Sequence, residues 1–99
     1  MKAKTAAEKR WHEFVAKIPC VVCSRFGGGG GRITLHHVAK GSGVRSHFAV
    51  VPLCEEHHQG GAGLHCMGPR RFLMLYRPPD EDEYGLLVWL LEDVAALVS

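Results

Sequence analysis

The segment Pro52-Leu-Cys-Glu-Glu-His-His58 is the most informative part of this chain, because it contains half of a metal-ligand pattern. Its Cys54-x2-His57 pair follows an earlier pair, in Cys20-Val-Val-Cys23, after a gap of 30 residues. Thiolate and imidazole both bind zinc well, and zinc favours four such ligands in a tetrahedron. A knuckle turn and the first turn of a helix can each bring two ligands toward one point. The spacing therefore predicts a structural zinc ion held by Cys20, Cys23, Cys54 and His57.

The fourth ligand of this zinc site has one alternative, the spare thiol of Cys66. His57 is favoured over Cys66 because only His57 completes a second x2 pair. A disulfide framework is not expected, since Lys2 and Lys4 are not followed by the apolar stretch of a secretory signal. We therefore expect a cytoplasmic protein whose cysteines are metal ligands or buried thiols.

The residues between the two ligand pairs have the pattern of a β-hairpin. Residues 32–37 are expected to form one strand and residues 47–52 the returning strand, with a glycine-containing turn after Lys40. Cys54 to His58 has the pattern of the first turn of a helix, because Glu55 and Glu56 suit the positive end of a helix dipole.

Two longer helices are expected to flank this hairpin. The Thr5-x-x-Glu8 capping box predicts a helix of about residues 5–17, and a leucine-rich pattern predicts another of about residues 83–98. The chain is too short for two domains. The expected fold is therefore a small single α+β domain over residues 1–99, with its core at about residues 19–65.

Histidine is unusually frequent, with seven residues in the chain and six of them between positions 36 and 65. His36 and His37 are neighbours on a strand, so their side chains should point to opposite faces. This suits a division of roles in which one binds a metal ion and the other acts as a base. His58 lies about 100° around the helix from His57 and faces away from the zinc. His65 follows on a glycine-rich segment that can fold back toward His58.

The net charge of +2 conceals an uneven distribution. Residues 1–50 contain nine lysines and arginines against two glutamates, whereas residues 51–99 contain three arginines against eight acidic residues. A basic half is typical of a face that binds a polyanion such as nucleic acid. A hydrophobic content of 46% excludes a wholly disordered chain. The longest apolar run has six residues, against about 20 for a membrane span, so no membrane association is expected.

The His36-His37 pair, the Pro52–His58 segment and the Cys-x2-Cys knuckle before them resemble the HNH, or ββα-metal, nuclease superfamily. Within it, the chain is similar to the phage recombination-enhancement, RecA-dependent nuclease family, which also has a Pro-Cys-x2-Cys knuckle and a trailing Gly-x-His like Gly63-Leu-His65. The similarity covers about residues 19–65. It implies a treble-clef-like ββα-metal finger with a zinc knuckle.

The resemblance also implies a role for each matching residue. His37 would be the general base that activates water. A catalytic divalent ion, Mg²⁺, Mn²⁺ or another transition metal, would be bound by His36, His58 and His65. The structural zinc would be held by Cys20, Cys23, Cys54 and His57.

The chain departs from the HNH pattern because it contains no asparagine. The asparagine of the pattern would fall near Ala49, nine residues before His58. His47, two residues earlier on the same strand face, is the nearby polar candidate for bracing the hairpin.

The implied enzyme is an HNH endonuclease, a phosphodiester hydrolase that hydrolyses or nicks DNA with little sequence specificity in a phage or recombination setting. Its expected partners are DNA and a recombinase filament or another phage protein, in a bacterial or phage-infected cell. Backbone contacts to DNA are expected from Lys40 and Arg45 around the turn, extended by Arg10 and Lys17.

Two other functions are compatible with the sequence. A non-catalytic treble-clef zinc module that binds DNA or protein explains the cysteines and the basic half, but it leaves His36, His37 and His65 without a role. The C-terminal helix is apolar on more than one face, so it is either a core helix or the interface of a homodimer; its apolar residues are Leu87, Trp89, Leu90, Leu91 and Val94.

Overall fold

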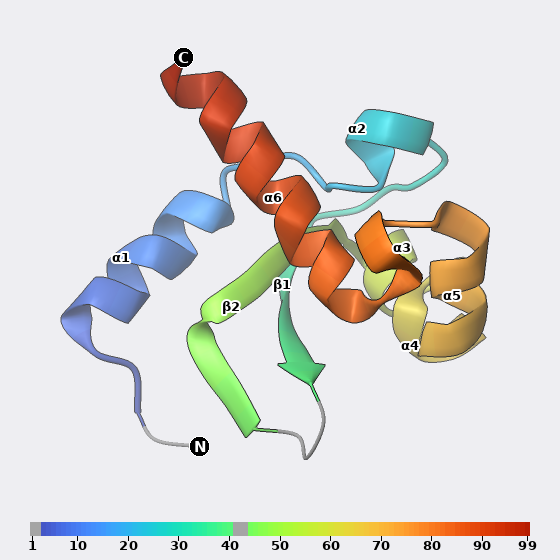
Figure 1. Ribbon diagram of the computed structural model, residues 1–99, viewed down its shortest axis with the longest axis horizontal. Coiled ribbons are helices and arrows are strands. Elements are labelled where there is room, and N and C mark those ends of the chain that lie inside the picture. Colours follow the sequence, from blue (N-terminus) through green and yellow to red (C-terminus); the bar gives the residue numbers. More distant parts are fainter. Residues whose placement is uncertain (1–2, 41–43) are drawn as a thin grey trace.

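A β-hairpin surrounded by helices forms the centre of the molecule (Figure 1). The computed structural model describes residues 3–40 and 44–99. Within them, the elements in chain order are α1 (Ala6–Val15), α2 (Cys23–Phe26), β1 (Ile33–Lys40), β2 (Val44–Cys54), α3 (Glu55–His58), α4 (Leu64–Met67), α5 (Pro69–Tyr76), the 3-10 turn η1 (Pro79–Glu81) and α6 (Glu83–Val98). The predicted α+β class is confirmed.

The two strands pair antiparallel, with His36 opposite Val51 and His37 opposite Val50. The register shifts between His37 and Ala39, which is a β-bulge directly after the two histidines. Both strands are longer than predicted, because the ladder continues beyond this irregularity to Lys40 and Val44, where the sequence shows no apolar alternation.

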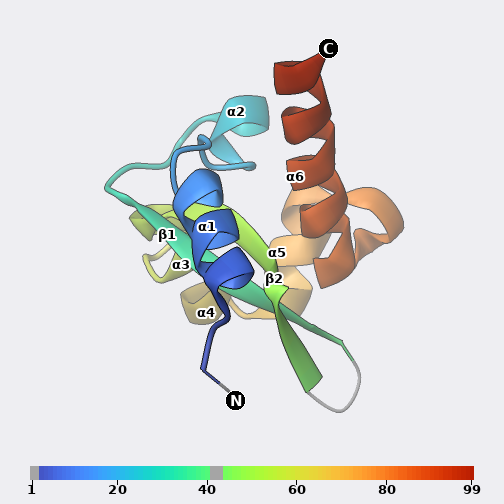
Figure 2. The same ribbon diagram turned by 90° about the vertical axis from the view of Figure 1, so that its left-hand side faces the viewer.

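Helix α1 begins as the sequence predicts. The Thr5 hydroxyl accepts a hydrogen bond from the Glu8 N–H at 3.2 Å, and the Glu8 carboxylate accepts one from the Thr5 N–H at 2.7 Å, which completes the capping box. The helix ends at Val15, ahead of Pro19. It packs on β2, whereas α6 packs against both strands, so that the hairpin runs between α1 and α6 (Figure 2).

One hydrophobic core joins these elements, with α6 as a main contributor. Leu86 and Leu90 of α6 are fully buried, together with Phe72 of α5. On the outer side of the same helix, Leu91, Leu97 and Val98 are exposed. The C-terminal helix is therefore a core helix over its first turns. No helix in residues 3–40 and 44–99 is long and apolar enough to cross a membrane.

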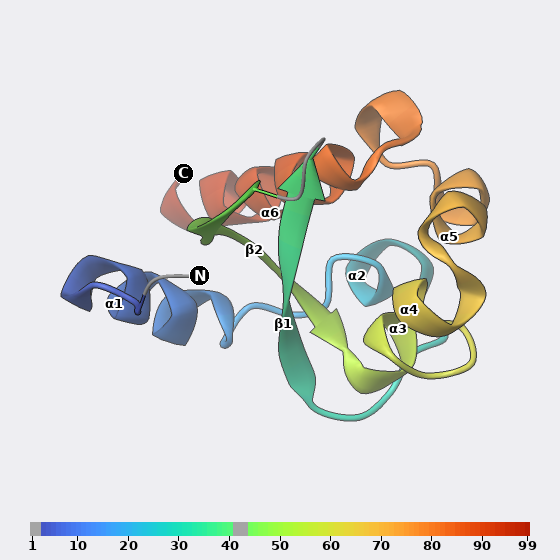
Figure 3. The ribbon, with the colours of Figure 1, turned by 90° about the horizontal axis from the view of Figure 1, so that it is seen from below.

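Helices α3, α4 and α5 lie together where β2 ends (Figure 3). The knuckle that contains Cys20 and Cys23 is fixed to the same end, because the Val21 N–H donates to the Pro52 carbonyl at 3.1 Å. The backbone therefore brings both halves of the predicted zinc pattern to one end of the hairpin.

Candidate metal centres and active site

The side chains of the four predicted zinc ligands lie close together at the start of α3. The Nδ1 atom of His57 lies 3.6, 3.3 and 3.4 Å from the sulfurs of Cys20, Cys23 and Cys54, and the sulfurs of Cys23 and Cys54 are 3.6 Å apart. Ligands of a tetrahedral zinc ion are separated by about 3.3–3.8 Å, given zinc–sulfur and zinc–nitrogen bonds of about 2.3 and 2.0–2.1 Å. The four side chains thus fit a zinc ion closely.

The backbone around this Cys/His site is shaped for sulfur ligands. The N–H of Cys23 points at the sulfur of Cys20, and the N–H of His57 points at the sulfur of Cys54, each at 3.4 Å. Gly29 closes the site from outside: a Cβ atom there would lie 2.5 Å from the sulfurs of both Cys23 and Cys54. The run of five glycines at residues 27–31 therefore includes one position where a side chain is excluded by the candidate metal ligands.

Burial acts on both kinds of ligand in this site. Burial, together with hydrogen bonding to Cys54, raises the pKa of Cys23 to about 12 without a metal ion. Burial also lowers the pKa of His57, which keeps this imidazole neutral and able to bind a metal. Cys66, the alternative fourth ligand, is exposed on α4 and is not one of the groups gathered at this site.

A second group consists of His36, His58 and His65, which come from β1, α3 and α4. One ring nitrogen of each lies within 4.8 Å of the others. The Nε2 atoms of His58 and His65 are 3.1 Å apart, close to the spacing of about 3.3 Å between two imidazole ligands of one zinc ion. The structure therefore brings together the three residues expected to bind a catalytic metal ion.

Thr34 determines which ring nitrogen of His58 carries the proton. The Thr34 hydroxyl donates its only proton to the Leu53 carbonyl at 2.8 Å, so it must accept a hydrogen bond from Nδ1 of His58, also at 2.8 Å. His58 then carries its proton on Nδ1, and the Nε2 lone pair faces His65. Burial, followed by the charges of His36 and His65, lowers the pKa of His58 to about 4. The ring is consequently neutral at pH 7, as a metal ligand must be.

Glu83 is a member of this site that the sequence did not indicate. Its carboxylate, at the first turn of α6, forms a short contact with Nε2 of His36. The side chains of His36 and Glu83 are 7% and 21% exposed. An acid beside a histidine ligand orients the ring, or itself supplies an oxygen ligand.

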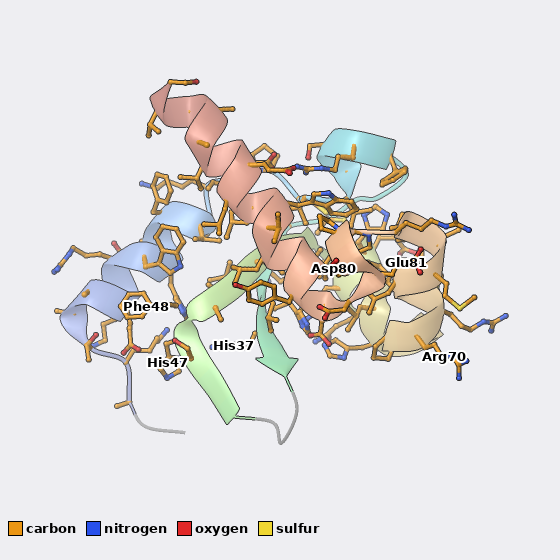
Figure 4. The ribbon with its side chains drawn as sticks, in the orientation of Figure 1. His37, His47, Phe48, Arg70, Asp80 and Glu81 are labelled. Carbon is orange, nitrogen blue, oxygen red and sulfur yellow. The ribbon has the colours of Figure 1, made fainter. Side chains whose placement is uncertain are left out.

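His37 points to the opposite side of β1 from His36. Its Nε2 atom lies 3.2 Å from Nδ1 of His47 on β2, and these two residues lie near one another in Figure 4. His12 of α1 donates from Nε2 to the backbone carbonyl of His47. The neighbour Trp11 donates to the next carbonyl, that of Phe48, at 2.9 Å. Two side chains of α1 thus hold two consecutive carbonyls of β2 beside His37.

The expected DNA-contacting residues come from the α1 region and from both strands of the hairpin. Arg10 and Lys17 are exposed on α1 and just after it. Lys40 and Arg45 belong by backbone to β1 and β2, but their side chains lie outside the described part of the structure.

A sequence profile of the family described as recombination enhancement, RecA-dependent nuclease matches residues 4–89. The match extends the similarity from the hairpin to α1 and the first turns of α6. No solved structure gives a significant match to the chain. The family name indicates a nuclease, and a nuclease that enhances recombination acts on DNA. Since the match spans most of the sequence, this chain belongs to the family of RecA-dependent nucleases of recombination enhancement.

Proposed function

We propose that the protein is a metal-dependent DNA endonuclease of HNH type that hydrolyses or nicks phosphodiester bonds with little sequence specificity. One observation carries this proposal: His36, His58 and His65 converge on one point, while the adjacent His37 projects from the other face of the same strand. A group of metal ligands and a separate imidazole base, linked by the adjacent strand residues His36 and His37, are what metal-assisted phosphodiester hydrolysis requires.

The donor set fits a divalent cation. Three imidazoles match the preferences of Zn²⁺ and Ni²⁺, and the nearby carboxylate of Glu83 is a ligand type that also suits Mg²⁺ and Mn²⁺. When bound, such an ion supplies Lewis-acid stabilisation of the charge that develops on the phosphate and on the leaving 3′ oxygen. Cys20, Cys23, Cys54 and His57 would hold a structural zinc ion that stabilises the fold.

His37 takes the proton of the attacking water. A neutral imidazole is suited to this step near pH 7. Its contact with His47 sets the orientation of the ring, and His47 in turn is held through its carbonyl by His12. In this chain without asparagine, His47 and the two α1 side chains together replace a single amide as the brace of the hairpin.

DNA is bound through phosphates. The proposed phosphate contacts are the exposed Arg10 and Lys17, in α1 and just after it, together with Lys40 and Arg45 of the hairpin strands. Such contacts are independent of sequence and sensitive to salt. The family name adds a requirement for a RecA filament, which would present the DNA strand to this surface.

A plasmid-cleavage assay tests the proposal. Cleavage is measured with Mg²⁺, Mn²⁺ or Ni²⁺, with and without RecA filaments, and with an EDTA control. His37→Ala should lower the rate by about 10²–10⁴-fold, as loss of a general base does, and added metal should not restore it. His36→Ala and His58→Ala should weaken binding of the catalytic ion, so that part of their activity returns at high metal concentration.

The exposed Leu97→Ala, near the end of α6, leaves the net charge unchanged as the histidine variants do and is the matched control, so its rate should equal that of the wild type. Zinc content is measured in every variant. Full activity of His37→Ala would refute a mechanism in which this residue is the base. Metal rescue of His37→Ala alone would mean that His36 and His37 have the opposite roles. A wild type that binds DNA but never cleaves it would favour the non-catalytic zinc module.

A further inference from the structure

Three histidines form a group that neither the zinc site nor the catalytic metal site uses. They are His12 of α1, His37 of β1 and His47 of β2, and one ring nitrogen of each lies within 4.8 Å of the others. Their ring centroids are 5.3–5.8 Å apart. His12 is only 8% exposed, although a histidine on an amphipathic surface helix has no need to be buried.

The geometry of this group matches that of the catalytic metal site. In each group, two imidazole nitrogens are in edge contact: His58 and His65 at 3.1 Å, and His37 and His47 at 3.2 Å. Both distances are close to the value of about 3.3 Å between two nitrogen ligands of one tetrahedral ion. In each group the third histidine, His36 or His12, is bonded to an oxygen at the edge of the group.

The charges around the group permit a cation. Lys4 lies 3.5 Å from Nδ1 of His12 and acts against a bound cation. Glu8 acts in the opposite sense. Its pKa is lowered first by its hydrogen bond to the Thr5 backbone and then by the charges of His47 and His12, so its carboxylate lies within electrostatic reach of both rings.

We propose that His12, His37 and His47 form a binding site for a transition-metal ion such as Zn²⁺ or Ni²⁺, and that an ion there prevents His37 from acting as a base. Imidazole is a good ligand for both metals, and three imidazoles leave one position for water. To bind the ion, the His12 ring gives up its hydrogen bond to the His47 carbonyl and offers a nitrogen lone pair to the metal instead. The second half of the proposal rests on the proposed function of His37.

Inhibition follows from the two nitrogens of one imidazole. A metal ion on Nε2 of His37 occupies the lone pair of that atom, and the ring then carries its proton on Nδ1. Neither nitrogen can accept a proton from water. The protein therefore uses a metal at one histidine group and is inhibited by a metal at the other, which makes cleavage respond to excess zinc.

The first test counts ions and needs no cleavage. Zinc-loaded protein is titrated with Ni²⁺ by calorimetry, and bound metal is measured after dialysis. The wild type should take up two Ni²⁺ ions beyond its zinc. His12→Gln retains an amide donor for the His47 carbonyl but lacks the imidazole, so the affinity of one site should fall by more than about 100-fold, since even partners outside the coordination sphere contribute 10–100-fold. His47→Gln should have the same effect.

His58→Ala is the matched variant for the other histidine group. It should also take up one Ni²⁺ less, and combination with His12→Gln should remove both. Circular dichroism and zinc content show whether each variant folds. If His47→Gln does not fold, His12→Gln alone gives the answer. A folded His12→Gln protein that binds as many Ni²⁺ ions as the wild type, with unchanged affinities, would overturn the site.

The second test measures inhibition. For each protein, the cleavage rate with excess Zn²⁺ is divided by its own rate without it. In the wild type this ratio should fall as the third ion binds, and His12→Gln should need about 100-fold more Zn²⁺ for the same fall. If the same Zn²⁺ concentration inhibited the wild type and His12→Gln equally, the inhibiting ion would bind at a site other than this histidine group. Absence of any cleavage would refute the proposed function, whereas the ion count would still decide whether the site exists.

Discussion

Gly29 illustrates how a single residue limits what can surround the Cys/His site. Its backbone lies against the sulfurs of Cys23 and Cys54 and against Cε1 of His57, which a Cβ atom would approach to 2.8 Å. The next residue, Gly30, has no atom within 4 Å of where its Cβ would be. Two adjacent glycines in one flexible-looking run therefore have quite different tolerance for a side chain.

We expect Gly29→Ala to destabilise the protein by about 1–3 kcal/mol, as overpacking of a close contact does. Gly30→Ala should be neutral or stabilise by up to about 1 kcal/mol, because it restricts the unfolded chain. Thermal unfolding and zinc content of the two variants provide the measurement. Equal melting temperatures for the two would show that the loop can move away from the metal ligands.

Thr34 and Glu83 show why the sequence predicted the candidate metal ligands but not the residues that contact them. The family resemblance implied the three residues of the second group, and the positions of His58 and His65 in the chain were compatible with it. Thr34 orients His58 from a different element, and Glu83 reaches His36 across 47 residues. Such contacts depend on how elements pack, and neither residue belongs to a local pattern.

At the scale of the elements, α1 does more than cover one side of the hairpin, because its side chains also hydrogen-bond to β2. Trp11 and His12 bind the carbonyls of Phe48 and His47, next to the β-bulge that follows His37. The capping box and the apolar stripe predicted the helix itself, and the leucine pattern predicted α6. The contact of α1 with β2 was not predicted, because the sequence shows which face of a helix is apolar but not which strand covers it.

The basic surface of α1 should contribute to DNA binding without sequence preference. Arg10→Gln should weaken binding equally on unrelated DNA sequences and reduce the slope of log K against log salt by about 1. Arg70→Gln removes the same charge from α5, which lies at the far end of the molecule from α1 (Figure 3), and is the control. Fluorescence anisotropy at several salt concentrations measures both. Equal losses for the two variants would mean that only net charge matters.

At the scale of the whole molecule, residues that could hold a metal ion account for an unusual share of the sequence. All seven histidines and three of the four cysteines lie in the Cys/His site or in one of the two three-histidine groups. A chain of 99 residues has a small core, and structural zinc contributes directly to the folding of such proteins. The stability of the protein should therefore depend on its metal content.

Cys23→Ser should lose zinc and show a lower melting temperature and lower solubility, whereas Cys66→Ser should retain zinc and melt like the wild type. The difference follows from position, since Cys23 contacts two other ligands and Cys66 is exposed. Bound zinc and thermal unfolding are measured for both variants. Loss of zinc from Cys66→Ser would instead support Cys66 as the fourth ligand, and a stable zinc-free Cys23→Ser protein would contradict a structural role for the metal.

The contact between His36 and Glu83 also has a consequence for protein synthesis. A ribosome completes the Cys/His site once residue 57 has been made, and the group of His36, His58 and His65 once residue 65 has been made. Glu83, at the start of α6, comes last. We therefore expect the emerging chain to capture zinc before the helix that completes the histidine group has folded, so that maturation proceeds in two stages and the proposed cleavage centre is the later of the two.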